Sequence, residues 1–189
     1  MTLQRPLEMT DEQILEAILR EDASAQRLLY EKFARKMFGV CLRYTKQREE
    51  AEDLLQEGFI KVFQKISSYK AEGSLEGWIR RVMVNTALDH IRKQKMLWTD
   101  LEDVKEKGDE PAIGHEIGAA ELMAELQKLP IGYKTVFNLH AIEGYSHKEI
   151  SKIVNISEGT SKSNLSRARV ILQRRVGSYT GLKKKVVNE

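Results

Sequence analysis

Residues 145–175 read YSHKEISKIVNISEGTSKSNLSRARVILQRR, and this stretch predicts a helix, a sharp turn and a second, basic helix. Ser146 stands three residues before Glu149, so each side chain can cap a free backbone amide at a helix start. Asn155 tolerates the left-handed backbone conformation with which many helices end. We therefore expect the first helix to stop just before Asn155 and the second to begin at Ser157, whose hydroxyl is a favourable N-cap.

The second helix of this stretch carries an apolar stripe and a polar face. Leu165, Ala168 and Leu172 recur at three- and four-residue spacing, which predicts a buried face. Proteins use such a pair of helices to place polar side chains in the DNA major groove. The polar residues predicted to contact bases and phosphates are Lys162, Ser163, Asn164, Ser166 and Arg167. The alternative is an ordinary amphipathic hairpin whose basic face is only solvated.

The charge of the chain is unevenly distributed. The 189 residues carry a net charge of +3. Residues 99–116 hold seven acidic residues against two lysines, a net of −5, which leaves +8 for the rest of the chain. Three glycines and a proline between Gly108 and Gly118 predict a flexible linker, so we place the domain boundary there. The acids either solubilise this linker or let it occupy a channel built for nucleic acid.

Several classes of function find no support in the sequence. No apolar segment is long enough to cross a bilayer, and no signal peptide is recognisable, so we expect a cytoplasmic protein without membrane insertion. Cys41 is the only cysteine and lies in an apolar helical pattern, which favours a buried thiol. The four histidines lack metal-ligand spacing, and no phosphate-binding loop or nucleophile motif is present. We therefore expect no metal, no other cofactor and no catalytic residue.

The N-terminal half is predicted to be helical, with segments over 11–20 and 24–44 and a sharply amphipathic helix over 49–66. The buried face of that third helix is predicted to consist of Ala51, Leu54, Leu55, Phe59, Val62, Phe63 and Ile66. Its opposite face presents Asp53, Gln56, Glu57 and Ile60. An exposed isoleucine among polar groups is typical of a docking surface, although isolated apolar residues on surfaces are also normal.

The next helix is predicted over 74–95, with Ser74 as its N-cap. Its polar face carries Arg81, Asn85, Asp89 and Arg92, aligned by four-residue spacing, with Arg80, Lys93 and Lys95 beside them. This face is either a second nucleic-acid surface or an exposed salt-bridged stripe. The preceding loop, 67–74, contains Tyr69 and Lys70 and could hold an unstacked base.

Three segments taken together carry a family resemblance: AEDLLQEGFIKVF at 51–63, WIRRVMVNTALDHIRK at 78–93 and LPIGYKTVFNLHAIEGYSHKEISKIVNISEGTSKSNLSRAR at 129–169. They resemble a bacterial RNA polymerase sigma factor of the sigma-70 family, extracytoplasmic-function (ECF) group, over 22–95 and 122–176. The resemblance implies an all-α protein with two helical domains. The expected parts are an N-terminal extension (1–21), a region 2 helical bundle (22–96), a flexible acidic linker (97–118), a region 4 helix-turn-helix domain (119–178) and a basic tail (179–189).

The resemblance also implies what each part does. The chain would be no enzyme, but would bind core RNA polymerase, at the clamp of the largest subunit and at the flap, and direct initiation at promoters. An anti-sigma factor is a further implied partner, and the linker would thread toward the RNA path. The implied core-binding residues are Asp53, Gln56, Glu57 and Ile60. For the minus-10 element and a base flipped into the 67–74 loop they are Tyr69, Lys70, Arg81, Asn85, Arg92 and Lys93. For the minus-35 element they are Thr160, Lys162, Ser163, Asn164, Ser166 and Arg167.

The chain departs from the usual family pattern at three positions in the helix-turn-helix. Ser161 stands where valine is usual, Asn164 where arginine is frequent, and Ser151 where alanine is frequent. These changes leave the promoter sequence open, and Ser161 should pack the second helix less tightly than valine while still fitting the fold. Two alternatives remain: a stand-alone helix-turn-helix regulator, and a DNA-processing enzyme, for which the carboxylates at 49–53 are wrongly spread around their helix.

Overall fold

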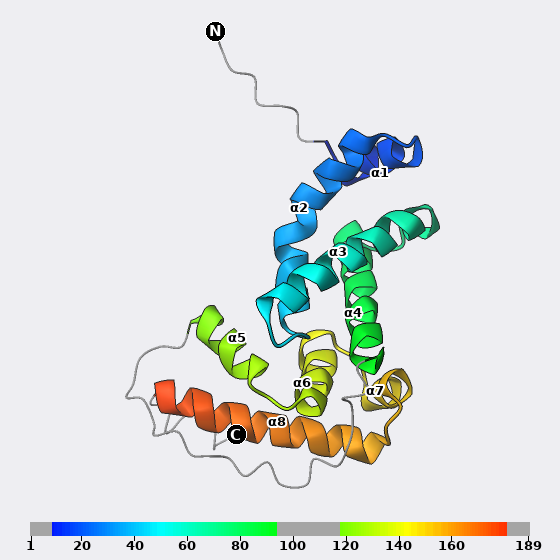
Figure 1. Ribbon diagram of the computed structural model, residues 1–189. Coiled ribbons are helices and arrows are strands. Elements are labelled where there is room, and N and C mark those ends of the chain that lie inside the picture. Colours follow the sequence, from blue (N-terminus) through cyan, green and yellow to red (C-terminus); the bar gives the residue numbers. More distant parts are fainter. Residues whose placement is uncertain (1–8, 94–117, 181–189) are drawn as a thin grey trace. The chain divides into compact units, whose positions relative to one another are not determined.

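The computed structural model describes residues 9–93 and 118–180, and all regular secondary structure in these ranges is helical (Figure 1). The predicted all-α fold is therefore confirmed. Residues 97–117 of the predicted linker, residues 181–189 of the predicted tail and Lys95 lie outside the described residues. The elements are α1 (Asp11–Leu19), α2 (Ala23–Leu42), α3 (Arg48–Lys65), the 3-10 turn η1 (Ile66–Ser68), α4 (Leu75–Lys93), α5 (Ala119–Gln127), α6 (Ile131–Phe137), the π-helical turn η2 (Asn138–Ile142), α7 (His147–Val154) and α8 (Glu158–Thr180).

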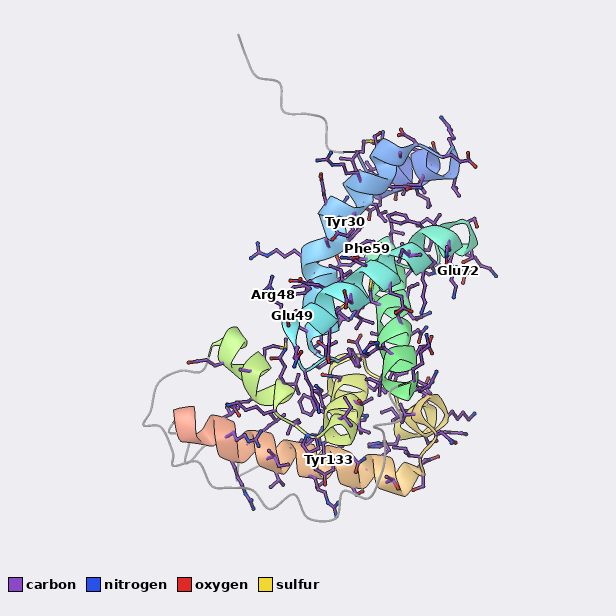
Figure 2. All side chains as sticks on the ribbon, in the orientation of Figure 1. Tyr30, Arg48, Glu49, Phe59, Glu72 and Tyr133 are labelled. Carbon is purple, nitrogen blue, oxygen red and sulfur yellow. The ribbon has the colours of Figure 1, made fainter. Side chains whose placement is uncertain are left out.

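Of the described residues, 9–41 and 47–87 form the first of two compact units. It contains α1, α3 and most of α2 and α4, and its core includes the predicted face of α3, of which only Phe63 is more than 7% exposed. The ring of Phe59 on α3 packs against Tyr30 on α2, with ring centroids 4.7 Å apart (Figure 2). Cys41 is buried, as its apolar surroundings in the sequence predicted.

Gly58 allows α3 and α4 to approach closely. Gly58 lies on the buried face of α3, and a Cβ atom added there would stand 2.2 Å from the sulfur of Met83 on α4. Met83 is fully buried, so its side chain cannot move aside into solvent. The packing of these two helices therefore depends on the missing side chain at position 58.

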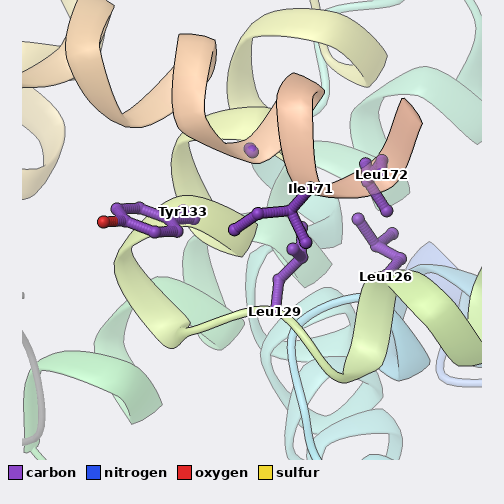
Figure 3. Packing of buried hydrophobic residues seen from close by; sticks show 6 residues of the cluster. Leu126, Leu129, Tyr133, Ile171 and Leu172 are labelled. Atoms are coloured by element: carbon purple, nitrogen blue, oxygen red, sulfur yellow. The ribbon is translucent and has the colours of Figure 1, made fainter. Parts of the chain in front are cut away.

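The second unit comprises Leu42–Lys46 and, of the described residues, 88–93 and 118–180. Helix α8 packs against α5, α6 and α7. Its apolar cluster consists of Leu126, Leu129, Tyr133, Ala168, Ile171 and Leu172. Figure 3 shows Ile171 and Leu172 of α8 facing Leu126 and Leu129, with Tyr133 beyond Ile171. The apolar spacing predicted for the second helix of the helix-turn-helix thus builds the core that holds that helix.

Three buried polar side chains in the second unit have hydrogen-bond partners. Lys134 is 0% exposed, and its ammonium donates to the carbonyl oxygen of Thr45 at 2.9 Å. The side-chain amide of Asn138 donates to the carbonyl oxygen of Arg43 at 2.7 Å. The buried carboxylate of Glu125 accepts from Lys128 at 2.7 Å. Such partners offset the cost of removing polar and charged groups from water.

Candidate DNA and protein interfaces

The helix-turn-helix forms where the capping signals predicted it. The hydroxyl of Ser146 accepts from the backbone amide of Glu149, and the backbone amide of Ser146 donates to the Glu149 carboxylate, which completes the capping box of α7. The two hydrogen bonds from Ser146, through its hydroxyl and its backbone amide, lower the pKa of Glu149. Helix α7 ends at Val154, and Asn155 follows with a φ of 54°. The hydroxyl of Ser157 then accepts from the amide of Thr160 and caps α8.

The buried stripe of α8 is wider than the predicted one. It also contains two polar residues, Ser161 and Asn164, which are 0% and 4% exposed. Both continue the three- and four-residue spacing of Leu165, Ala168 and Leu172. The prediction that Asn164 points to DNA is therefore corrected, because its side chain lies on the inner face of the helix. We exclude it from the proposed reading surface.

The remaining predicted reading residues lie together on the exposed side of α8. Thr160, Lys162, Ser163, Ser166 and Arg167 are all exposed and occupy the first half of the helix. Ser163 hydrogen-bonds back to the carbonyl oxygen of Thr160 at 3.0 Å. Arg167 donates to the hydroxyl of Tyr133 at 3.3 Å, which anchors one edge of its guanidinium. The arrangement offers cationic and hydroxyl groups in the part of a recognition helix that approaches base edges.

The outer face of α3 presents the predicted docking residues on one surface. Asp53 and Gln56 are exposed, and Ile60 is 56% exposed, the largest value among the exposed large apolar residues of the described chain. Glu57 is partly covered and pairs with Lys61 at 2.9 Å. The surface combines one apolar anchor with carboxylate and amide groups, as central residues of protein interfaces do.

The exposed face of α4 carries the predicted basic and amide residues. Arg81, Asn85, Arg92 and Lys93 are exposed. Arg92 forms an ion pair with Asp89 at 2.9 Å, so part of the face is the salt-bridged stripe that the sequence left open as an alternative. Arg81 and Lys93 supply one cation near each end of this face, and Asn85 supplies an amide between them.

The loop between η1 and α4 is organised by an aromatic side chain. The hydroxyl of Tyr69 donates to the carbonyl oxygen of Gly73 at 2.7 Å, and its ring lies 5.7 Å from that of Trp78. Ala71 and Gly73 adopt left-handed φ values of 56° and 96°. Lys70 is exposed. The sequence identified Tyr69 but not its internal role; the glycine four residues later and the tryptophan nearby were the available signals.

Sequence reasoning missed a pair of histidines in the helix-turn-helix. The rings of His140 and His147 stack with centroids 4.5 Å apart, and His147 Nδ1 lies 2.8 Å from the hydroxyl of Ser161. Burial lowers the pKa of His147, and His140, Lys162 and Arg169 act in the same direction, while Glu158 opposes them. His140 belongs to η2 and His147 to α7, and the chain between these elements is not helical, so helical spacing does not relate the two positions.

Metal-ligating and membrane-spanning features can be assessed only in the part of the chain that the structure describes. Within residues 9–93 and 118–180, no group of three or more His, Cys, Asp or Glu side chains could hold a metal ion. No helix in these ranges is long and apolar enough to cross a membrane.

Two family models match the chain in succession. The model of Sigma-70 region 2 matches residues 29–96, and that of Sigma-70, region 4 matches residues 119–172. The matches contain the exposed faces of α3 and α4 and the exposed face of α8, respectively. Every interface residue retained above therefore lies inside a matched region.

Similar proteins cover most of the chain. The ECF RNA polymerase sigma-E factor of Haemophilus influenzae is 27% identical, over 89% of this chain and 96% of its own length. The ECF RNA polymerase sigma factor SigM of Bacillus subtilis is 31% identical, over 75% and 88%. Among solved structures, the sigma factor RpoE of Bartonella quintana, crystallised with the anti-sigma factor NepR, aligns with a TM-score of 0.51. The two sequences are 20% identical, and the alignment covers 84% of this chain and 98% of the RpoE chain. The similarity is one of fold.

Proposed function

Because the chain belongs to the sigma-70 family of RNA polymerase sigma factors, in the ECF group, we propose that three of its exposed helix faces divide the work of transcription initiation. The chain binds core RNA polymerase and directs it to promoters. The observation that carries this function is the succession of a region 2 match and a region 4 match in one chain. A stand-alone helix-turn-helix regulator would require only the second match and is not favoured.

The outer face of α3 is the proposed surface for core polymerase. Ile60 would supply the apolar anchor, and Asp53, Gln56 and Glu57 would orient it through polar contacts with the clamp. Support comes from the 56% exposure of Ile60 on a helix whose other face is buried. Burying such a side chain against a partner contributes about 1.5–3 kcal/mol when it was fully exposed before, so a half-exposed one contributes less.

The α4 face and the Tyr69 loop are the proposed surface for the minus-10 element. Arg81, Arg92 and Lys93 would neutralise phosphates, Asn85 would contact a base, and Tyr69 and Lys70 would border a base extracted from the duplex. Extracting one base costs a few kcal/mol. Contacts made only to the open strand can offset that cost, so strand opening would require no bond chemistry by this chain, and we propose that it is no enzyme.

The exposed side of α8 is the proposed surface for the minus-35 element. Lys162 and Arg167 suit phosphates or guanine edges, and Thr160, Ser163 and Ser166 can hydrogen-bond bases or phosphates. Because Asn164 faces the core, base reading would fall to its exposed neighbours. We therefore propose that five residues contact the minus-35 element directly, in place of the six that the sequence predicted.

An anti-sigma factor is a proposed further partner. Support is limited to the likeness in fold to a sigma factor that was crystallised with NepR. A protein that covers the α3 face would compete with core polymerase for the chain. If core polymerase and the anti-sigma factor compete for the purified chain, and if an Ile60→Asp variant binds neither, the anti-sigma factor binds that face.

The function is tested by transcription from a library of random promoter sequences with purified bacterial core polymerase. Reactions with the chain, without it, and with the Gln56→Ala, Ile60→Asp double variant are compared by sequencing transcript starts. We expect starts that require the wild-type chain and share two spaced upstream elements. Starts that are the same in all three reactions, with polymerase from the same species, would reject the function.

A further inference from the structure

A hydrogen bond joins the two helices of the helix-turn-helix at their inner faces. Ser161 on α8 is 0% exposed, and its hydroxyl lies 2.8 Å from Nδ1 of His147, the first residue of α7. Ser161 stands between Thr160 and Lys162, two residues of the proposed minus-35 surface. A shift of Ser161 relative to α7 would therefore move Thr160 and Lys162 relative to the DNA.

His140 extends this contact to a third element. Its ring stacks on that of His147, 4.5 Å away with an interplanar angle of 12°, and its Nδ1 lies 2.9 Å from the carbonyl oxygen of Tyr145. A carbonyl oxygen only accepts hydrogen bonds, so Nδ1 of His140 carries the proton. His140 belongs to η2, and the Tyr145 carbonyl immediately precedes the N-cap of α7. The two rings thus connect η2, the start of α7 and the buried face of α8.

We propose that His147 is a positioning residue for recognition of the minus-35 element: its hydrogen bond to Ser161 and its stacking on His140 hold α8 at the angle that specific binding requires, and protonation of His147 loosens that hold. The proposal rests on the proposed function of α8. It differs from a general packing role because it concerns the ratio of specific to nonspecific DNA binding.

The charges around His147 give the contact its dependence on pH. His140 faces it from η2, and Lys162 and Arg169 face it from α8, where Glu158 supplies the only opposing charge of the group. Burial and these cations place the pKa of His147 below its ordinary value of 6.5. At neutral pH the ring is uncharged and stacks without repulsion. Acidification below 6.5 adds positive charge to His147 beside Lys162 and Arg169 of α8.

Four variants separate the parts of this contact. Ser161→Ala removes only the hydroxyl. His147→Asn keeps a polar atom at the position of Nδ1 but cannot titrate, and His147→Phe keeps a stacking ring without the hydrogen bond. His140→Phe keeps a stacking ring and removes the second imidazole. Circular dichroism and thermal melting of each full-length variant confirm that it is folded before binding is compared.

The binding experiment uses holoenzyme assembled from core polymerase and the full chain. The probes are the promoter most enriched by wild-type chain in the library experiment and the same DNA with its upstream element scrambled, between about pH 5 and pH 8, where imidazoles titrate. Ser161→Ala and His147→Phe should lower the ratio of the two affinities about three- to tenfold at neutral pH, the worth of one hydrogen bond. His147→Asn should retain the ratio and lose the decline that wild type shows on acidification.

A second measurement is independent of DNA and polymerase. In the free chain, the proton NMR titration of His147 should have a midpoint below 6.5, and His140→Phe should raise that midpoint. An equal loss of affinity for both DNAs in Ser161→Ala, a His147→Asn profile that still follows wild type, or an NMR midpoint unmoved by His140→Phe would overturn the proposal. A wild-type chain that initiates at no promoter would instead reject the proposed function, and the NMR titration would still show whether the two rings are coupled.

Discussion

Ser146 shows how much of the helix-turn-helix depends on one local side chain. Its hydroxyl and backbone amide form three hydrogen bonds with Glu149 at the start of α7. Ser146→Ala removes the cap and should lower the free energy of unfolding by about 1 kcal/mol. Urea unfolding of the full chain measures the change. Ser163→Ala is the control, because its hydroxyl bonds only to a carbonyl within α8, and an equal loss in both variants would contradict the capping role.

Glu149 should make the stability of this helix start depend on pH. Hydrogen bonds from Ser146 lower the pKa of its carboxylate below 4.5 in the folded chain, so the unfolded chain binds the proton more readily. The stabilising contribution is therefore complete above 4.5 and is lost as the pH falls through the lower, folded value. The free energies of unfolding of wild type and Glu149→Gln should converge on acidification, as urea unfolding at a series of pH values would measure. A difference that stays constant below 4.5 would oppose this assignment.

Arg167 is the exposed cation of α8 whose contact with DNA is most directly testable. If its guanidinium neutralises one phosphate, Arg167→Ala should reduce the slope of log affinity against log salt by about 0.9. Fluorescence anisotropy with holoenzyme and selected promoter DNA at several salt concentrations gives the slope. Tyr133→Phe removes the hydroxyl that Arg167 contacts but keeps the charge, and should leave the slope unchanged. A wild-type slope in Arg167→Ala would exclude the phosphate contact.

At the scale of helices, Gly58 sets the separation of α3 and α4. Gly58→Ala should lower the free energy of unfolding by about 1–2 kcal/mol, because the new methyl group overlaps the sulfur of buried Met83. In a Met83→Ala background the space is vacant, and the same substitution should stabilise by up to about 1 kcal/mol through helix propensity. A double-mutant cycle followed by urea unfolding measures this reversal of sign. Additive effects would show that the two helices adjust without strain.

The helix ends were predictable where their signals are local, and the apolar members of the α8 stripe were also predicted, but its buried asparagine was not. Ser146, Asn155 and Ser74 act on backbone groups within a few residues, so the ends they predicted are confirmed for α7 and for the start of α4. Ser161 and Asn164 occupy inner positions of α8 as polar residues. The apolar pattern alone assigned Asn164 to the surface, whereas Ser161 was expected to pack within the fold. The partner of the Ser161 hydroxyl, His147, comes from another helix, so no local pattern marks it.

At the scale of the whole molecule, the chain must bind two partners of different chemistry. The proposed DNA surfaces on α4 and α8 are rich in arginine and lysine, which suit phosphate. The proposed polymerase surface on α3 presents two carboxylates and an isoleucine instead. A uniformly basic surface would attract DNA to every face of the chain, whereas acidic groups on α3 disfavour DNA there. The distribution of charge by helix therefore matters more for function than the net charge of +3.

Separate surfaces imply that polymerase binding can be removed without unfolding the chain. Gln56→Ala with Ile60→Asp should weaken binding to core polymerase at least tenfold, because the apolar anchor is replaced by a charge that must be desolvated. Thermal stability should change little, since both residues are exposed. Leu19→Asp is a matched control, because Leu19 is 53% exposed beside 56% for Ile60 and lies outside the region 2 match. Competition with a labelled wild-type chain for core polymerase measures the affinities of the double variant and of Leu19→Asp. Unaltered affinity of the double variant, or an equal loss of affinity in Leu19→Asp, would exclude α3 as the docking helix.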